Sequence, residues 1–366
     1  MPYSIVHTES SVGWGGQEIR VLRESKAFLD RGHQVTVLAP AEAEIAKRAS
    51  DFGVPICRVP IFHRNFHAFW SLRKALKRLK PDLVNTHSST DSWLVAAVCF
   101  SIRHPPKVVR TRHICSQPSR SITTRWLYNK AAQKVVTTGE AIRAQILKLG
   151  IPADHVVSIP TGINPDSYPP GSKNEAKLCL ELSGLTVIGV VATIRSWKGH
   201  RVLIEALKDL PSSDYRLLFV GDGPIRRALQ EELHAAGLAD LVLFAGHQND
   251  VLPWLHAMDI FVLPSYANEG ISQALVQAMM AGIPVVTTTA GAITEVAKHG
   301  ETALVVEPND CQALRKAVAT LLDDPQLARK LATSARQFVL EHHSEAVMVE
   351  RMDAVFQQLQ PLSGKR

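Results

Sequence analysis

Hydrophobic and polar positions follow a repeated order along the chain, in which a short β-branched run, a turn and an amphipathic stretch lead into another short run. Short apolar runs are typical of strands covered on both faces, and apolar residues at i, i+3 and i+4 are typical of helices. In the first half this pattern predicts strands at residues 3–7, 34–38, 54–59, 82–86, 107–110, 134–137 and 155–159. In the second half it predicts strands at residues 186–192, 216–220, 241–244, 260–263, 284–287 and 303–306. Predicted helices include residues 16–30, 71–80 and 140–149, and others that begin near residues 200, 225, 249, 271 and 312.

Strands that alternate with helices indicate parallel sheets, and a total of 366 residues fits two domains of ordinary size. Residues 160–177 are rich in Pro and Gly, which is typical of a linker. We therefore predict an α/β fold with two Rossmann-like, doubly wound domains, residues 1–168 and 169–343, that face each other across a ligand-binding cleft. Residues 344–366 are predicted to form a C-terminal helix that returns to the first domain.

Charge is distributed unevenly between the two halves. Residues 1–168 hold 23 Lys and Arg against 12 Asp and Glu, whereas the remainder holds 18 against 22. An excess of positive charge favours an anionic partner for the first half, such as phosphate groups or an anionic lipid surface. No nucleic-acid-binding module is recognisable, so we expect no nucleic acid partner.

Other features of the composition exclude several classes of protein. The five cysteines are scattered and lack a CxxC spacing, and no HExxH motif, carboxylate pair or Cys/His cluster indicates a metal site. We expect a metal-independent protein without a bound cofactor. No secretory signal or membrane-spanning stretch is visible, which favours the cytoplasm.

Candidate phosphate-binding residues occur where predicted strands end and helices begin. In the first half, Gly15 and Gly16 open a helix, where the backbone can approach a phosphate. The spacing Gly13-x-Gly15-Gly16 is not that of the dinucleotide-binding G-x-G-x-x-G motif, which disfavours a nicotinamide enzyme. His87 follows a strand and is a candidate for contact with the sugar of a donor substrate, although a lone histidine is more often structural.

The next strand ends in three polar residues that suit an anionic ligand, Arg110, Arg112 and His113. We interpret them as a site for an anionic part of a substrate. This part is either a phosphate of a group donor or an anionic acceptor. A surface cluster without a ligand is the alternative.

Residues 62–80 combine six cations with four aromatic residues, among them Phe66, Phe69 and Trp70, and contain no acid. This combination suits contact with an anionic membrane surface, for which the candidate residues are Arg73, Lys74, Lys77 and Arg78. A solvated helix whose aromatic residues face the core is the alternative.

Residues 259–286 hold the densest group of chemically useful side chains in the second half. A buried strand leads to Glu269, which can accept hydrogen bonds from hydroxyl groups. It is followed by a helix start whose free N–H groups suit an anion, at Gly270, Ile271, Ser272 and Gln273. Gln277 lies further along the same helix, and an ordinary capped helix is the alternative interpretation.

The stretch PSYANEGISQALVQAMMAGIPVV resembles a signature of the retaining, nucleotide-sugar-dependent glycosyltransferases of family 4. Further motifs of that family follow the same order along almost the whole chain: RGHQVTVL, PDLVNTHSS, IPTGINPDSY, VGDGP, FAGHQNDV and TTTAGAITEVAKHGETALVVEPND. The resemblance implies the GT-B fold and a retaining, metal-independent transfer of a hexose from a UDP-sugar or GDP-sugar.

The resemblance also implies roles for particular residues. Glu269 is expected to contact donor hydroxyl groups, while Gly221 and the helix start after Glu269 lie beside the donor. In the loop VVATIRSWKGH, Lys198 corresponds to a cation that clamps the diphosphate. The second cation of the family is replaced by Thr193, and we expect Arg195 to substitute for it. Gln277 stands where the family has a ribose-binding Glu. Its hydrogen bond to the ribose of the nucleotide is therefore expected to be weaker.

The sequence thus predicts a glycosyltransferase that acts on a membrane-associated glycan or lipid-linked acceptor, such as lipopolysaccharide core. It is expected in the cytoplasm, peripheral to the inner face of the membrane. A nucleotide-sugar 2-epimerase and a non-catalytic sugar- or lipid-binding protein on a degenerate scaffold are the alternatives. The departures Thr193, Gln277 and Ala292 favour the second of these, and retention of Glu269 and Lys198 opposes it.

Overall fold

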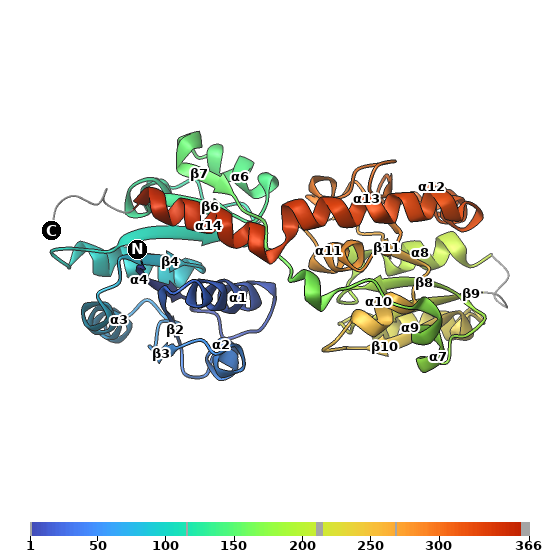
Figure 1. Cartoon of the computed structure of the whole chain (residues 1–366), viewed down its shortest axis with the longest axis horizontal. Coiled ribbons are helices and arrows are strands. Elements are labelled where there is room, and N and C mark those ends of the chain that lie inside the picture. The colour runs from blue at the N-terminus through green and yellow to red at the C-terminus, as the bar shows by residue number, and fades with distance from the viewer. Residues whose placement is uncertain (1, 115, 210–214, 268, 360–366) are drawn as a thin grey trace. The chain divides into compact units, whose positions relative to one another are not determined.

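The computed structural model describes residues 2–114, 116–209, 215–267 and 269–359. It contains two compact units, of which the first comprises residues 1–162 and 345–366 and the second comprises residues 163–344 (Figure 1). The two parts of the chain are therefore described separately. Cys115 and the last seven residues of the predicted C-terminal segment lie outside the described residues.

The first unit is built on a seven-stranded parallel sheet with the order β3-β2-β1-β4-β5-β6-β7. Its strands are β1 (Ser4–Thr8), β2 (Gln34–Ala39), β3 (Ile56–Arg58), β4 (Leu83–Thr86), β5 (Lys107–Arg112), β6 (Lys134–Thr137) and β7 (Val156–Ser158). Its helices are α1 (Gly16–Asp30), α2 (Glu44–Arg48), α3 (Phe66–Leu79), α4 (Ser89–Phe100), α5 (Ile122–Trp126), α6 (Glu140–Leu147) and α14 (Glu345–Leu359).

Successive residues of a strand point to opposite faces of the sheet. Apolar side chains lie on both faces here, and helices cover each of them. Ile5 of β1 packs in a cluster with residues of α1 and α14, whereas the next residue, Val6, packs in a cluster with α3 and α4. Helix α14 contributes Met348, Met352 and Phe356 to the first of these clusters. A segment from the C-terminal end of the chain therefore completes the core of the first unit (Figure 1).

The second unit is built on a six-stranded parallel sheet with the order β10-β9-β8-β11-β12-β13. Its strands are β8 (Thr186–Val191), β9 (Tyr215–Val220), β10 (Val242–Gly246), β11 (Ile260–Leu263), β12 (Val285–Thr288) and β13 (Leu304–Val306). Its helices are α7 (Lys173–Cys179), α8 (His200–Leu207), α9 (Arg226–Ala235), α10 (Leu252–Ala257), α11 (Gln273–Met280), α12 (Cys311–Asp323) and α13 (Pro325–His343).

The boundary between the units lies at Gly162, before the predicted boundary at residue 168. Ile163 is fully buried in the core of the second unit, and its N–H donates to the carbonyl of His343 at 2.9 Å. Tyr168 also packs against that core. The later part of the predicted linker is therefore structured, because its apolar side chains are buried despite the neighbouring prolines.

Each sheet changes its winding direction between two adjacent strands, β1 and β4 in the first unit and β8 and β11 in the second. Chain segments that leave two such strands diverge, which opens a crevice at the carboxyl ends of the strands. The candidate residues were therefore sought at these two places.

Candidate functional site

An ion pair joins the two strand ends at the switch point of the second unit. Lys198 lies in the loop after β8, and Glu269 lies in the loop after β11. The Lys198 Nζ atom is 2.8 Å from both carboxylate oxygens of Glu269. The side chain of Glu269 is 6% exposed and that of Lys198 is 18% exposed, so both are shielded yet reachable. The structure thus brings together two predicted residues that lie 71 positions apart in the sequence.

Glycine is required where the backbone of this loop approaches its neighbours. Gly199 has a φ of +76°, and a Cβ atom there would lie 1.9 Å from the carbonyl oxygen of Pro264. Gly221 has a φ of +142°, and a Cβ atom there would lie 2.0 Å from the carbonyl oxygen of Ala192. Only glycine fits these two positions without moving the backbone. The close approach places Gly221 beside Thr193, so these two predicted residues are neighbours.

Helix α11 begins at Gln273, with Ser272 as the residue that caps it. The hydroxyl of Ser272 accepts a hydrogen bond from the N–H of Leu275. Gly270 and Ile271 therefore precede the helix, and Ile271 packs against the hydrophobic core. The expected helix start near Ile271 is wrong by two residues, because the serine side chain takes the capping position.

The remaining predicted donor residues differ in their surroundings. Gln277 Nε2 donates a 2.8 Å hydrogen bond to the hydroxyl of Tyr168, so its amide is already engaged with the start of the second unit. Thr193 and Arg195 are exposed. The guanidinium of Arg195 lies over the ring of Trp197, 5.2 Å from its centroid. Arg195 is thus free of the Glu269 pair that holds Lys198.

A cavity of about 390 Å³ lies at the switch point of the first unit. All six residues that the sequence predicted for this half as sugar or phosphate contacts line it: Gly15, Gly16, His87, Arg110, Arg112 and His113. Gly16 is the first residue of α1 and Gly15 caps it. Gln17, Glu18 and Ser88 also line the cavity and were missed by the sequence analysis.

Three imidazoles form a chain beneath this cavity. The Nδ1 atom of His7 is 2.9 Å from Nε2 of His87, and Nδ1 of His87 is 2.9 Å from Nε2 of His113. His7 lies on β1 and is fully buried, while its Nε2 atom has no hydrogen-bond partner in the described part of the chain. Each link needs one protonated and one unprotonated nitrogen, so the three tautomers depend on one another.

Burial keeps these imidazoles neutral. It lowers the pKa of His7 to about 3, with a smaller contribution from Arg20. Burial also places the pKa of His87 and that of His113 well below the usual value, and nearby cationic groups act in the same direction. At neutral pH the chain therefore presents an uncharged imidazole, His113, to the cavity.

The two arginines that line the cavity are held by neutral partners. Arg110 donates to the carbonyl of Ser88 at 3.1 Å, and its guanidinium lies over the ring of Tyr128, 4.7 Å from the centroid. Arg112 donates to the hydroxyl of Tyr128 at 2.9 Å. The Nε atoms of both arginines are buried without a partner among the described residues. Two cations without a paired carboxylate favour an anionic ligand in this cavity.

Two buried carboxyl groups lie below the cavity. Glu9 accepts hydrogen bonds from Gln17 and from the N–H of Ser11, and Asp91 accepts from the N–H of His87 at 3.0 Å. Burial raises the pKa of Asp91 to about 7 and raises the pKa of Glu9. Burial thereby disfavours the charged form of both groups, while Glu18 is a further acidic residue among those that line the cavity.

Helix α3 carries the predicted membrane-contact residues. Phe66 is 85% exposed and Trp70 is 57% exposed, whereas Ala68 and Leu72 are buried. The alternative in which the aromatic residues face the core is therefore wrong for Phe66 and Trp70. The helix also begins before the predicted residue 71, because the side chain of Asn65 caps it.

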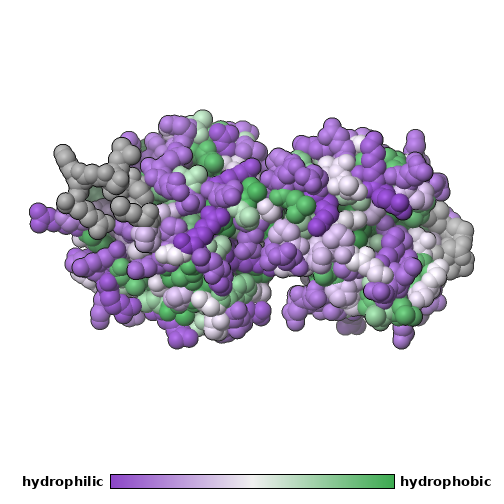
Figure 2. Space-filling view, viewed as in Figure 1, coloured by the Kyte–Doolittle hydropathy of each residue, from purple (hydrophilic) through white to green (hydrophobic). Residues whose placement is uncertain are grey.

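The four predicted cations of α3 have different partners. Lys74 and Lys77 are exposed. Arg73 lies over the ring of Trp70 and donates to the hydroxyl of Ser101 at 3.1 Å, and Arg78 lies 3.1 Å from the sulfur of Cys57. Hydrophobic side chains appear among the polar ones in the lower part of the visible face of this unit (Figure 2).

The residues that the structure describes contain no group of three or more His, Cys, Asp or Glu side chains arranged to hold a metal ion. Among the helices that the structure describes, none has the length and the apolar character needed to cross a membrane.

The two parallel sheets with these strand-end residues define the GT-B fold of glycosyltransferases. The crystal structure of Anabaena HepE in complex with UDP and glucose matches it with a TM-score of 0.83 and 22% identity. The match covers 97% of this chain and 99% of that chain. The similarity establishes the fold.

Two family models together match most of the chain. "Glycosyltransferase Family 4" matches residues 14–167, and "Glycosyl transferases group 1" matches residues 180–338. The chain belongs to this glycosyltransferase family and is an enzyme of the hexosyltransferase type.

Curated relatives are similar at moderate identity. The 2-deoxystreptamine glucosyltransferase of Streptomyces kanamyceticus is 24% identical, over 92% of this chain and 98% of the relative. The lipopolysaccharide core biosynthesis mannosyltransferase LpsB of Rhizobium meliloti is 32% identical, over 49% of this chain and 55% of the relative.

Proposed function

We propose that this enzyme transfers a hexose from a nucleotide-sugar to a membrane-associated glycan or lipid-linked acceptor, with retention of configuration and without a metal ion. The observation that carries the proposal is the Lys198–Glu269 pair at the switch point of the second unit. It combines a cation, which suits a diphosphate, with a carboxylate, which suits sugar hydroxyl groups.

The chemistry of donor cleavage needs positive charge near the leaving group. The nucleoside diphosphate gains negative charge as the glycosidic bond breaks, and preorganised cations that face this charge lower the barrier. Lys198 supplies one such cation, and the exposed guanidinium of Arg195 supplies a second. Glu269 accepts hydrogen bonds from donor hydroxyl groups and, while the site is empty, keeps Lys198 in position.

The remaining donor contacts in the proposal come from the backbone and from neutral side chains. The N–H groups after Glu269, at Gly270, Ile271 and Gln273, would meet the donor. Gly221 leaves room beside Thr193. Gln277 would have to exchange its hydrogen bond with Tyr168 for one with a ribose hydroxyl, which predicts weaker nucleotide binding than a glutamate would give.

The retaining course is supported by the family to which the chain belongs. In this mechanism the acceptor hydroxyl attacks from the face that the nucleotide leaves, and the leaving phosphate takes its proton. A bond from acceptor oxygen to the sugar carbon forms while the bond to the diphosphate breaks, so no further reactant is needed.

The proposal assigns the acceptor to the first unit. His87, Arg110, Arg112 and His113 surround a cavity that suits a sugar carrying phosphate, with the neutral imidazole as a hydrogen-bond partner. The exposed Lys74 and Lys77 would face an anionic membrane, each with a contribution of about 1 kcal/mol. The name of LpsB, a lipopolysaccharide core biosynthesis mannosyltransferase, supports an acceptor of the lipopolysaccharide type, and an enzyme that acts on such an acceptor would work peripherally at the inner face of the membrane.

A thermal-shift panel of UDP, GDP, ADP and their sugar conjugates tests the donor site. A ligand at a hundred times its dissociation constant stabilises the protein by about 2.7 kcal/mol, which raises the midpoint by several degrees. We expect one nucleotide family to shift the midpoint and the others to leave it unchanged. If no nucleotide does so, the departures at Thr193 and Gln277 have disabled the site, and the non-catalytic alternative replaces this proposal.

Two further measurements test the reaction and the membrane contact. An epimerase would convert the active donor to an isomer without an acceptor, which analysis of the sugar product detects and which would contradict transfer. Flotation with liposomes that contain or lack anionic lipid tests the surface. We expect binding only to anionic liposomes, and equal binding to both would remove the charge-based part of the proposal.

A further inference from the structure

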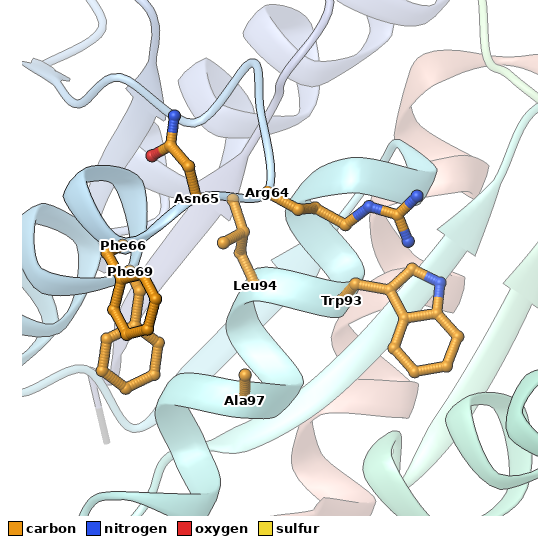
Figure 3. A pocket seen from close by; sticks show the side chains of 7 residues that line it. All are labelled: Arg64, Asn65, Phe66, Phe69, Trp93, Leu94 and Ala97. Atoms are coloured by element: carbon orange, nitrogen blue, oxygen red, sulfur yellow. The ribbon is translucent and has the colours of Figure 1, made fainter.

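Between helices α3 and α4 of the first unit lies an apolar groove with a volume of about 330 Å³ (Figure 3). Phe66 and Phe69 of α3 line one side, and Trp93, Leu94 and Ala97 of α4 line the other. Trp93, Leu94 and Ala97 lie outside residues 62–80, the stretch that the sequence predicts for membrane contact. The volume is within the usual range for small-molecule sites.

The solvent-facing side of α4 is apolar. Trp93, Ala97 and Phe100 are spaced four and three residues apart and form one apolar stripe along the helix, and the polar residue Ser89 precedes this stripe by one turn. Ala97 is exposed, and Phe100 is 90% exposed. A helix in a monomeric protein normally presents polar residues to water, so a large exposed apolar stripe marks a binding surface.

This stripe connects the groove with the polar cavity. Ser89 lines the cavity that contains Arg110 and Arg112, and Trp93, one turn later on α4, lines the groove. One helical turn is about 5.4 Å. A ligand with a polar end and an apolar end could therefore occupy both places along the same helix.

Charge around the groove indicates which chemistry the polar end has. Between residues 52 and 139 the sequence contains fifteen Lys and Arg residues and two acidic residues, Asp82 and Asp91. Asp91 is fully buried, and Asp82 accepts a hydrogen bond from the N–H of Ser4 at the opposite end of the strands. Arg64 stands at the rim of the groove (Figure 3). A second copy of this chain would bring like charges together, whereas a phosphate would be attracted.

Large hydrophobic side chains are exposed in the same part of the chain. Phe62, Phe66, Trp70, Phe100, Ile114, Ile122 and Trp126 are all at least 37% exposed, and all lie within residues 62–126. Cations interleaved with exposed aromatic residues suit an amphiphile that has both a phosphate and a hydrocarbon chain.

We propose that the groove between α3 and α4 binds the hydrocarbon chain of a phosphate-bearing lipid, whose phosphate lies toward the cavity with Arg110 and Arg112. The inference rests on the proposed function in that this lipid is the acceptor. It goes beyond adsorption to a membrane, because it requires a single lipid to be withdrawn partly from the bilayer and held in a defined groove.

Calorimetric titration of the full chain with dodecyl phosphate below its micelle concentration tests the proposal. Inorganic phosphate is the control that carries the phosphate alone. Dodecyl maltoside is the control that carries the same hydrocarbon chain without a phosphate. We expect dodecyl phosphate to bind once per chain and more tightly than either of the other two. Equal binding of dodecyl maltoside would show that phosphate is not recognised, and this result would overturn the proposal.

The variant Ala97→Asp places a carboxylate in the groove at an exposed position, where the fold tolerates it. Its control is Ala235→Asp, since Ala235 is an exposed residue of α9 in the second unit. We expect Ala97→Asp to weaken dodecyl phosphate binding by at least about tenfold and Ala235→Asp to change it by less than about twofold. Equal affinity in both variants would overturn the proposal.

The same titrations separate this inference from the proposed function. A chain that binds a nucleotide in the thermal-shift panel but not dodecyl phosphate contradicts the lipid groove alone. A chain that binds dodecyl phosphate but no nucleotide contradicts the transferase proposal alone. A wild-type dimer that dissociates in Ala97→Asp, without amphiphile binding, would show that a second copy covers the groove and would also overturn the inference.

Discussion

In the first unit, buried side chains hold the strand-end residues in place, whereas in the second unit the backbone itself comes close. His7, His87 and His113 position one another, and Arg110 and Arg112 share Tyr128. In the second unit, the loops approach through glycines, and one ion pair joins them. The first site therefore depends on which side chains are buried together, and the second depends on the absence of side chains at a few positions.

The surfaces of the two units also differ, in exposed hydrophobic side chains and in charge. Among the described residues, large exposed hydrophobic side chains are concentrated in the first unit, and only Leu178 and Leu243 belong to the second. The first half of the sequence also carries the positive charge. A unit that meets a lipid or membrane-bound acceptor needs such a surface, whereas a unit that binds a water-soluble donor does not.

The largest effect that we predict concerns a buried ion pair of the first unit. Arg20 and Glu24 on α1 are four residues apart, fully buried, and 3.4 Å from each other. Glu24→Ala leaves the Arg20 charge buried without its acid, which should lower the free energy of unfolding by about 3–5 kcal/mol. Urea unfolding measures this loss.

The matched control is an exposed pair with the same spacing in the second unit, Arg227 and Glu231 on α9. Glu231→Ala should leave stability almost unchanged, because water screens exposed charges. Equal losses in the two variants would contradict the view that the first unit relies on its buried side chains.

The next effect is on turnover in the second unit. In the proposed mechanism Lys198 faces the leaving diphosphate, so Lys198→Ala should lower kcat at least about a hundredfold, or about 2.7 kcal/mol. The fold should persist, because Lys198 is partly exposed and lies in a loop. Release of nucleoside diphosphate measures turnover, and wild-type rates in the variant would exclude Lys198 from catalysis.

A third prediction tests the close backbone approach. Gly221→Ala would force a Cβ atom to within 2.0 Å of the carbonyl oxygen of Ala192. Gly237→Ala is the control, since Gly237 also has a positive φ but no atom within 4 Å of such a Cβ. Strain at φ alone is about 1–3 kcal/mol, so Gly221→Ala should destabilise the chain by more than the control does. Thermal unfolding compares them, and equal midpoints would contradict the steric requirement.

The smallest effect concerns pH. Burial lowers the pKa of His200 to about 4, so between pH 6.5 and 4 the unfolded chain binds a proton that the folded chain does not. The free energy of unfolding that is due to His200 therefore decreases as the pH falls, by up to about 1.4 kcal/mol per pH unit. His200→Phe should reduce that slope and keep the packing, because the ring of His200 meets that of Phe219 edge to face and makes no hydrogen bond in the described structure.

Replacement of the exposed His234 by Phe is the control for this measurement and should leave the slope unchanged. In the first unit the raised pKa of Asp91 has the opposite effect on stability as the pH falls. The folded chain keeps a proton on Asp91 up to about pH 7, and the unfolded chain releases it. On unfolding of the first unit, His7, His87 and His113, whose pKa values are lowered by burial, take up protons, whereas Glu9, Glu24 and Asp91, whose pKa values are raised by burial, release them, so the two effects partly cancel. The acid sensitivity assigned to His200 should consequently appear in the second unit when hydrogen exchange is followed at pH 7 and pH 5.

Local sequence patterns predicted much of the fold. The strand at residues 260–263 and the helix start at Gly16 coincide with the structure, because a strong apolar run and a glycine pair mark them. The start of α3 was missed, since Phe66 to Trp70 lack the usual polar alternation and only the cap Asn65 indicates a helix. The structured part of the linker was missed because prolines suggested irregular backbone.

The sequence likewise predicted some residues of the candidate sites and missed others. Glu269 was found from the local pattern of strand, turn and helix start, and Lys198 through the family resemblance, but their contact depends on the adjacency of β8 and β11, which no local pattern contains. His7 was missed because it reads as an ordinary strand residue. Only the pairing of β1 with β4, which aligns His7 with Asn85, brings it beside His87. An isolated strand histidine beside a second strand-end histidine is the signal that could have indicated it.

Helix α14 has a consequence for the order in which the chain is made. Its side chains Met348, Met352 and Phe356 pack with Tyr3 and Phe28, residues that leave the ribosome first. Domains generally fold in the order of their synthesis. Here the first unit must wait until the whole second unit has been translated before its own core can close. During that interval the apolar face that α14 later covers is accessible to chaperones.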